Sequence, residues 1–185
     1  DAPTISIFLK PPGVIPPGGS TTICCSCQYG NGKFMLYKDG YLSDTPKGPG
    51  SRAEFSISNA NKNDTGAYSC HYVDGDTVLA RSETVDVIVQ EFHLPRPVFS
   101  VLPGRKVVAG AYVIFRCTIT SPSAGCFLYQ EGQIKILNLF SKEKDYFNLS
   151  HVHKGNEGRY SCQCFTKTTS FKWSAVSETL DLVVR

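Results

Sequence analysis

The sequence has no run of ~20 apolar residues, the length that a membrane-spanning helix needs, anywhere in its 185 residues. It has no G-x-S-x-G, P-loop or H-E-x-x-H motif, and no nucleophile has a base placed beside it by sequence. It also has no run of lysines and arginines of the kind that binds nucleic acid. These absences argue against a spanning segment in this chain, against an enzyme and against a nucleic-acid-binding protein.

Cysteine, glycine and proline are what the chain does have, with 8, 16 and 11 copies, and helical periods are few. This composition is typical of a disulfide-bonded β protein from an oxidising compartment. The chain begins with Asp1 and carries no apolar leader, so we expect that a signal peptide has been removed. It stops at Arg185, where a last strand ends, so we expect an ectodomain cut from a longer membrane-anchored protein.

A motif of the form D-x-G-x-Y-x-C occurs at residues 64–70 and, with Asn in place of Asp, at residues 156–162. The two motif cysteines are 92 residues apart, and so are Cys25 and Cys117. A repeat of this length indicates two copies of one domain. In an immunoglobulin-type sandwich such a tyrosine hydrogen-bonds back to the turn, and the cysteine reaches the facing sheet. We therefore predict an all-β chain of two tandem immunoglobulin-like (C2-type) β-sandwich domains, residues 1–91 and 92–185, joined by a short elbow.

Alternating residues and turn signals predict the strands. In the first copy they cover 4–9, 21–28, 34–38, 53–58, 67–73 and 77–90; in the second they cover 113–119, 127–132, 146–149, 160–166 and 180–184. Leu36 lies 11 residues after Cys25, about where antibody domains bury a tryptophan.

The repeat predicts the disulfides Cys25–Cys70 and Cys117–Cys162, each spanning 45 residues. Cys27 shares a strand face with Cys25 and is the rival partner for Cys70. The 92-residue register aligns Cys27 with a core isoleucine, which favours Cys25.

A third bridge, Cys126–Cys164, is predicted because both cysteines point inward on neighbouring strands, where facing Cβ atoms lie ~4.5–5.5 Å apart. The alternative is a pair of buried thiols. Cys24 and Cys27 remain. They face opposite ways in a regular strand, so we expect Cys27 to be buried and Cys24 to be exposed or capped.

Metal binding is the other interpretation of these cysteines and of the pair His151-x-His153. The Tyr-x-Cys context assigns Cys70 and Cys162 to disulfides, and the histidines are expected to be solvated. We therefore predict no metal site and no cofactor. The sequons Asn63-Asp64-Thr65 and Asn148-Leu149-Ser150 predict exposed N-glycosylation sites.

Three further motifs carry a family resemblance. Leu-Tyr-Lys/Gln-Asp/Glu-Gly occurs at 36–40 and 128–132, Leu-Pro-Arg-Pro at 94–97 runs into Leu-Pro-Gly at 102–104, and Trp-Ser-x-x-Ser occupies 173–177. Together they resemble the leukocyte-receptor-complex branch of the immunoglobulin superfamily: killer-cell and leukocyte immunoglobulin-like receptors, the IgA Fc receptor, the platelet collagen receptor, the osteoclast-associated receptor, natural cytotoxicity receptors and avian immunoglobulin-like receptors. The first copy departs from the pattern, with Ala80-Arg81-Ser82 where the Trp-Ser pair would lie.

The resemblance implies the extracellular part of an immune cell-surface receptor. Its implied ligand is a protein: an antibody Fc as first choice, or an MHC class I molecule or collagen. Membrane anchoring would come from a missing C-terminal segment, and signalling from missing parts or from an adaptor. A second hypothesis is a soluble, secreted binding or inhibitor protein of plasma built from the same domains.

Recognition in such folds is carried by loops on a rigid sandwich, and aromatic residues are favoured at binding hot spots. The candidate ligand-binding residues are Tyr29, Lys33, Tyr41, Tyr72, Asp74 and Asp76 in the first domain, with Phe92 and Leu94 in the linker. The alternative for each tyrosine is that it only packs the sandwich.

The charge of the chain is unevenly distributed. Residues 1–91 hold 7 lysines and arginines against 10 acidic residues, while residues 92–185 hold 12 against 6. Two interpretations remain open: two ordinary solvated surfaces, or a basic second domain that meets an acidic partner or a glycosaminoglycan.

Overall fold

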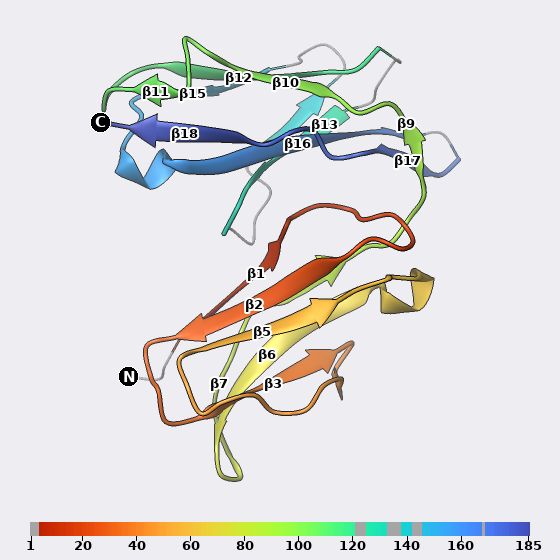
Figure 1. The fold of residues 1–185 in the computed structure, drawn as a ribbon, viewed down its shortest axis with the longest axis vertical. Coiled ribbons are helices and arrows are strands. Elements are labelled where there is room, and N and C mark those ends of the chain that lie inside the picture. Colours follow the sequence, from red (N-terminus) through yellow and green to blue (C-terminus); the bar gives the residue numbers. More distant parts are fainter. Residues whose placement is uncertain (1–3, 121–124, 133–137, 142–145, 168) are drawn as a thin grey trace. The chain divides into compact units, whose positions relative to one another are not determined.

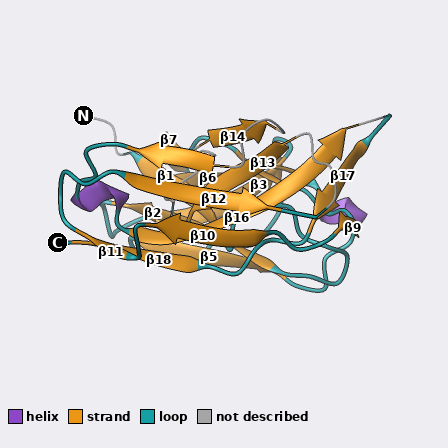
Figure 2. Cartoon of the chain, turned by 90° about the horizontal axis from the view of Figure 1, so that it is seen from above, coloured by secondary structure: helices purple, strands orange, loops and turns teal. Residues whose placement is uncertain are grey.

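The computed structural model of the chain describes residues 4–120, 125–132, 138–141, 146–167 and 169–185. Within these residues the secondary structure consists of strands and two short 3-10 turns, shown in orange and purple in Figure 2. No helix in this part of the chain is long and apolar enough to cross a membrane. The chain divides into two compact units, Asp1–Gln90 with Gly132–Ile134, and Glu91–Glu131 with Lys135–Arg185. The predicted all-β class with two immunoglobulin-like domains is confirmed.

The first unit is a sandwich of two antiparallel sheets (Figure 1). One sheet has the order β1 (Ile5–Lys10), β2 (Thr21–Cys27), β5 (Arg52–Ile57), and the other has the order β4 (Tyr41–Leu42), β3 (Lys33–Lys38), β6 (Gly66–Asp74), β7 (Thr77–Arg81), with β8 (Val85–Val87) also paired to β6. Alternate residues point between the sheets, as expected for half-buried strands. The core includes Ile7, Ile23, Phe34, Phe55 and Tyr72, each at most 1% exposed.

The second unit repeats this plan. One sheet has the order β10 (Val98–Leu102), β12 (Val113–Thr118), β15 (Tyr146–Leu149), and the other has the order β11 (Lys106–Val107), β18 (Leu180–Val184), β16 (Gly158–Lys167), β13 (Gly125–Gln130), β14 (Asn138–Ser141), with β17 (Phe171–Ser174) also paired to β16. The core includes Val113, Phe115, Leu128, Tyr160 and Leu182. Leu128 and Leu36 are both buried, so a leucine fills the site of the antibody tryptophan in each unit.

The linker contributes a strand that the sequence did not predict. Phe92–Leu94 forms β9, which runs parallel to β17 and pairs Phe92 with Trp173 and Leu94 with Ser174. The first residues after Gln90 therefore belong to a sheet of the second unit.

The tyrosine of each repeated motif binds the turn before its strand, as predicted. Turn η1 (Lys62–Asp64) precedes β6, and turn η2 (Lys154–Asn156) precedes β16. Tyr68 donates its hydroxyl to the Asp64 carbonyl at 2.7 Å, and Tyr160 donates to the Asn156 carbonyl. Burial, together with the charges of Asp64 and Asp39, raises the pKa of Tyr68 to about 12, and burial raises that of Tyr160 to about 12. Both hydroxyls therefore stay protonated as donors at physiological pH.

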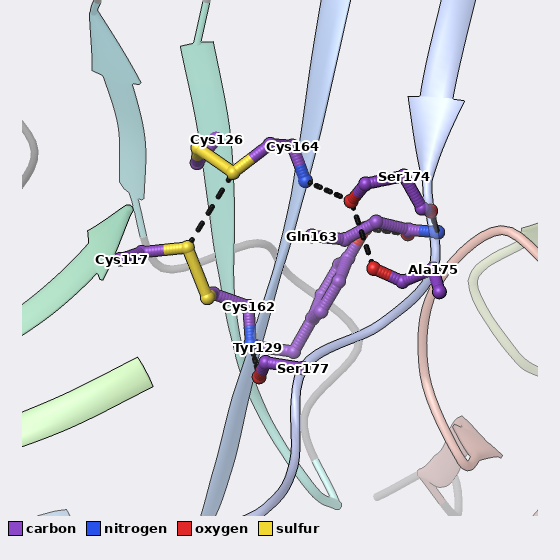
Figure 3. The surroundings of a disulfide bond; sticks show 9 residues. All are labelled: Cys117, Cys126, Tyr129, Cys162, Gln163, Cys164, Ser174, Ala175 and Ser177. Carbon is purple, nitrogen blue, oxygen red and sulfur yellow. Dashed lines mark hydrogen bonds between the residues drawn. A yellow bond between two sulfur atoms is a disulfide. The ribbon is translucent and has the colours of Figure 1, made fainter. Parts of the chain in front are cut away.

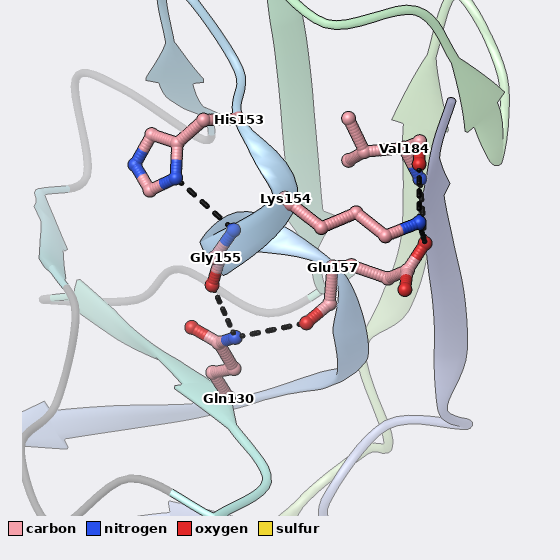
Figure 4. A network of polar contacts seen from close by, with 6 residues as sticks. All are labelled: Gln130, His153, Lys154, Gly155, Glu157 and Val184. Carbon is pink, nitrogen blue, oxygen red and sulfur yellow. Dashed lines mark hydrogen bonds and ion pairs between the residues drawn. The ribbon is translucent and has the colours of Figure 1, made fainter.

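A polar network ties the end of β18 to turn η2 (Figure 4). The Glu157 carboxylate accepts a hydrogen bond from the Val184 N–H at 2.9 Å and pairs with the Lys154 ammonium at 3.2 Å. Lys154 also donates to the Val184 carbonyl at 2.8 Å, and Gln130 donates to the Glu157 carbonyl at 3.3 Å. The Val184 amide and Lys154 lower the pKa of the Glu157 carboxyl, since both favour its charged form.

Acid is expected to weaken this network. Because the pKa of Glu157 is lower in the folded chain, its contribution to stability is present above the ordinary value and is lost as the pH falls through the folded value. We expect Glu157→Gln to show a smaller loss of urea-unfolding midpoint between pH 7 and pH 3 than the unmodified chain. The exposed Glu178→Gln is the control. An equal acid-induced loss in Glu157→Gln and Glu178→Gln would contradict this assignment.

Candidate functional site

Three disulfides are present, and they are the three that the sequence predicts. Cys25–Cys70 joins β2 to β6 and Cys117–Cys162 joins β12 to β16, so each links the two sheets of its unit. The third joins the neighbouring strands β13 and β16, where Cys126 lies directly opposite Cys164. The rival bridge from Cys27 to the first-unit motif cysteine is not formed.

The two disulfides of the second unit are in contact (Figure 3). The sulfur atoms of Cys117 and Cys164 are 3.5 Å apart, and those of Cys117, Cys126 and Cys164 all lie within 4.8 Å of one another. All three sulfurs belong to disulfides. None of them can act as a thiolate ligand for a metal while those bonds are intact.

The expectation for the two remaining cysteines was wrong. Cys24 is buried, whereas Cys27 is half-buried and packs against the core. Cys24 does point to the outside of β2, but Phe8 and Glu54 are its cross-strand neighbours and cover it. Its sulfur lies 3.8 Å from a Glu54 carboxylate oxygen. Parity gives the face of a residue, whereas its exposure depends on the size of its neighbours.

Four of the predicted ligand-binding residues lie together at one end of the first unit. Lys33 begins β3 and pairs with Val73, so the start of β3 and the end of β6 lie at the same end of the sheet. The loop before β3 holds Tyr29, Asp74 is the last residue of β6, and Asp76 lies in the turn after it. All four side chains are exposed, and Tyr29 is 46% exposed. The structure thus brings an aromatic ring and charges of both signs to one end.

The segment between β4 and β5 completes this end. The Phe34 and Lys47 backbones exchange two hydrogen bonds, at 2.8 and 2.9 Å, and the Gly50 N–H donates to the Gly32 carbonyl at 3.1 Å. Residues 28–33, 46–51 and 74–76 together are called the loop end below.

Tyr72 was predicted to be a ligand anchor, and the structure corrects this. Its side chain is 0% exposed, and its ring packs on Phe34 with 4.8 Å between centroids. The hydroxyl accepts from the Gly32 N–H at 2.7 Å and donates to the Gly50 carbonyl at 3.3 Å. A Cβ at position 32 would lie 2.5 Å from the Val73 carbonyl oxygen, so this approach requires glycine. Tyr72 therefore holds two segments of the loop end in place from inside.

Tyr72→Phe is expected to loosen the loop end while the sandwich stays folded. The change leaves the buried Gly32 N–H and the Gly50 carbonyl without this hydroxyl, which costs about 1–3 kcal/mol of unfolding free energy. Faster hydrogen exchange at the Gly32 amide would report the loosening. Tyr41→Phe, at a side chain that is 79% exposed, is the control and should change neither quantity. Unchanged exchange at Gly32 would show that the hydroxyl does not hold the loop.

The other predicted anchors lie elsewhere. Tyr41 begins β4 and pairs with Lys38, at the opposite end of β3 from Lys33, and a six-residue strand is roughly 17 Å long. Phe92 and Leu94 are half-buried in β9 of the second unit. These three residues are therefore not part of the loop end.

The serines of the Trp-Ser-x-x-Ser motif have a structural role that the sequence reasoning missed. Ser174 and Ser177 accept hydrogen bonds from the N–H groups of Cys164 and Cys162, at 2.9 and 2.8 Å, and each donates to the carbonyl of the next residue. The first unit keeps half of this arrangement, since Ser82 accepts from Cys70 N–H at 2.8 Å and donates to the Glu83 carbonyl. The Trp-Ser-x-x-Ser spacing, with two serines three residues apart, was the available signal.

The outward side of the second unit's larger sheet is closed by aromatic and amide groups. Phe127 stacks with Trp173 and Phe165, at 5.7 and 5.2 Å between centroids. Gln163 is 0% exposed; it accepts from the Tyr129 hydroxyl at 3.0 Å and donates to the Ser174 carbonyl at 3.0 Å (Figure 3). Burial raises the pKa of Tyr129 well above its ordinary value, so its hydroxyl remains a donor.

Both sequon asparagines are exposed. Asn63 lies in turn η1, and Asn148 lies on β15 with its side chain on the solvent side. Their use in a secretory host stays a prediction, for which a mass shift on glycosidase digestion is the test.

Comparison with known proteins gives the chain its relatives. No family model matches it. It is 30% identical over 176 residues to natural cytotoxicity triggering receptor 1 of Macaca fascicularis, covering 92% of this chain and 56% of the relative. It is 31% identical over 175 residues to immunoglobulin superfamily member 1 of Homo sapiens, covering 91% of this chain and 13% of the relative. A solved structure, the human OSCAR ligand-binding domain, covers 98% of this chain and 99% of its own at 26% identity, with a TM-score of 0.47.

The paired sandwiches and their inter-sheet disulfides define a tandem immunoglobulin-like protein. The relatives above confirm the resemblance of the chain to immunoglobulin-superfamily receptors of the leukocyte-receptor-complex type. Proteins of this kind are not enzymes, and neither is this chain. The chain spans about half the length of the macaque receptor and a small part of the longer human protein.

Proposed function

We propose that this chain is the extracellular ligand-binding region of an immune cell-surface receptor and that its loop end binds a protein ligand. The observation that carries the proposal is the loop end itself. It presents Tyr29, Lys33, Asp74 and Asp76 to solvent on segments that Tyr72 holds from inside. Binding loops on a rigid scaffold lose less entropy when they bind a ligand. A relative named as a triggering receptor, matched over 92% of this chain, supports the receptor class.

The ligand we propose first is an antibody Fc, followed by MHC class I and collagen. The loop end combines an exposed tyrosine with both signs of charge, which suits a polar protein surface. Anchoring through a membrane segment beyond this sequence, and signalling through that segment or an adaptor, belong to the same proposal.

A binding panel tests the proposal directly. The recombinant chain is measured against IgG, IgY and IgA, against class I molecules and against triple-helical collagen peptides. For the ligand that binds, Tyr29→Ala or Lys33→Ala is expected to weaken affinity by at least tenfold, as hot-spot truncations do. Tyr41→Ala is the matched control, since Tyr41 is an exposed tyrosine at the opposite end of the same sheet.

Two results would overturn the proposal. Equal losses from Tyr29→Ala and Tyr41→Ala would place the site away from the loop end. No binding across the panel, with tight binding to a protease or a small secreted protein, would favour the soluble plasma inhibitor instead.

A further inference from the structure

The outward face of the sheet β4-β3-β6-β7 in the first unit is an open surface of a distinct chemistry. Phe34, Leu36, Cys70 and Tyr72 point into the core, so the alternate residues of β3 and β6 point outward. With their neighbours on β4 and β7 they form the outer face, which comprises Met35, Tyr37, Leu42, His71, Val73 and Arg81.

An aromatic stack lies at the centre of the outer face. The rings of Tyr37 and His71 are stacked, with 3.9 Å between centroids and 24° between planes. Met35 and Arg81 are the direct cross-strand neighbours of His71 on either side. Leu42, next to Tyr37, is 55% exposed. A ligand can therefore reach apolar surface and a guanidinium within one patch.

The charge of the outer face differs from that of the unit that carries it. Residues 1–91 hold more acidic than basic residues, 10 against 7. The outward positions of β3, β6 and β7 nevertheless carry Lys33, His71 and Arg81, and the carboxylate on this side of the sheet, Asp86 of β8, lies opposite Ala67, four residues before His71 on β6. Asp74 is the last residue of β6 and pairs with Thr77, and Asp76 lies in the turn that follows. The outer face is thus a cationic, partly apolar patch on an acidic domain.

The same face of the second unit shows that this openness is particular to the first. There Tyr129, Gln163, Phe165 and Trp173 take the outward positions and are all at most 8% exposed. In the first unit Tyr37 and His71 stand in the places of Tyr129 and Gln163, and both remain half-exposed. One face is closed by its own side chains, and the other is left for a partner.

We propose that the outer face binds a protein surface that presents carboxylates beside apolar or aromatic side chains. The carboxylate pairs with Arg81 and with His71 in its charged form, while the apolar group packs on Tyr37 and Leu42. The partner is acidic because the charges it meets are positive. This deepens the proposed receptor function and rests on it, because it names the chemistry of the ligand and a second contact surface outside the loop end.

Such binding becomes tighter as the pH falls. Burial, and then the charge of Arg81, lower the pKa of His71, so its imidazole is mostly neutral at pH 7.5. Tyr37 and Met35 face it from β3, and Arg81 faces it from β7. Two further charges lie along the strands: Lys33 of the loop end pairs with Val73, and Asp86 of β8 lies opposite Ala67. A carboxylate placed beside the ring favours the charged form. One unit of pKa rise on binding corresponds to a tightening of up to about tenfold between pH 7.5 and pH 5.5.

The probe is an octapeptide in which glutamate alternates with phenylalanine and leucine, compared with the same peptide carrying lysine for glutamate. Binding to the whole chain is followed by NMR, at the imidazole signals of His71 and at the backbone amides. We expect the acidic peptide to shift the signals of His71 and Tyr37 and the lysine peptide to shift neither. We expect Arg81→Gln to weaken acidic-peptide binding at least fivefold. The matched control is Arg52→Gln, which removes an exposed arginine from the other sheet and should leave affinity unchanged.

Several results would overturn this inference. Equal weakening by Arg81→Gln and Arg52→Gln would show general charge attraction. The inference would also be wrong if the acidic peptide shifted signals of the second unit alone, or if the lysine peptide bound at the outer face. It would be wrong as well if His71→Gln bound the acidic peptide with the same pH dependence as the unmodified chain. The peptide test is independent of the ligand panel. If no panel ligand binds but the acidic peptide binds at the outer face, only the receptor proposal is wrong. If a panel ligand binds equally well to Arg81→Gln and the acidic peptide does not bind, only the proposal for the outer face is wrong.

Discussion

Replacing Cys25 and Cys70 together with alanine is expected to lower the unfolding free energy of the first unit by about 4 kcal/mol, the loop-entropy value for a 45-residue separation. This disulfide joins β2 to β6, and it restricts the unfolded chain by closing a loop. Its loss therefore raises the conformational entropy of the unfolded chain. Because single domains have only about 5–15 kcal/mol of stability, this unit should unfold near physiological temperature. Urea denaturation followed by a probe in the first unit measures the change.

The control for this experiment is Cys27→Ala, which alters a half-buried cysteine of the same strand outside the disulfides and should cost less than about 1 kcal/mol. Replacing Cys126 and Cys164 together should cost about 3 kcal/mol. Their separation is 38 residues, but with Cys117–Cys162 in place their bond closes a loop of only about eleven. A loss below 1 kcal/mol for the first pair would mean that its sheets are held by packing alone.

Strand parity explains why the disulfides could be predicted from the sequence. A cysteine two residues after another on one strand has the same face, so Cys164 follows Cys162 inward, and the register of β13 brings Cys126 to it. The 92-residue repeat added the second constraint by placing Cys25 and Cys117 at equivalent core positions. Fold class and bridges follow from such short-range rules because a half-buried strand has only two faces.

Exposure could not be predicted in the same way. Tyr72 sits two residues after Cys70, so parity already placed it inward, but its position beside a turn suggested a binding residue. Cys24 was placed on the correct face and given the wrong exposure, since Phe8 and Glu54 cover it from neighbouring strands. The return of residues 46–51 to Gly32 and the pairing of β9 with β17 both depend on contacts between distant segments. Periodicity within one segment carries no information about them.

The outer face illustrates the same limit for function. The repeat aligns Tyr37 with Tyr129 and His71 with Gln163, and on sequence the two pairs differ by one side chain. In space the first pair is a half-exposed stack, and the second is a buried hydrogen-bonded pair. The difference arises from the aromatic residues around the second pair, chiefly Trp173, which has no counterpart in the first unit.

Gln163→Glu is expected to turn this buried pair into a pH-dependent weakness of the second unit. A neutral carboxyl can replace both hydrogen bonds, donating to the Ser174 carbonyl and accepting from the Tyr129 hydroxyl. A charged carboxylate cannot donate, and at a 0% exposed site it is penalised by desolvation. Buried glutamates have pKa values raised by several units, and three units correspond to about 4 kcal/mol.

The sign of the effect follows from that raised pKa. Below about pH 4 the new carboxyl is protonated in both the folded and unfolded chains, so stability should lie within about 1 kcal/mol of the unmodified chain. As the pH rises above the unfolded value, the unfolded chain ionises first, and about 4 kcal/mol is lost by pH 7.5. Gln163→Leu is the matched control, because it removes the same two hydrogen bonds without a titrating group and should lose an equal amount at both pH values. Urea denaturation at pH 4 and pH 7.5 compares the two variants. A loss for Gln163→Glu that does not grow with pH would mean that water reaches position 163, and the closed face described for the second unit would then be wrong.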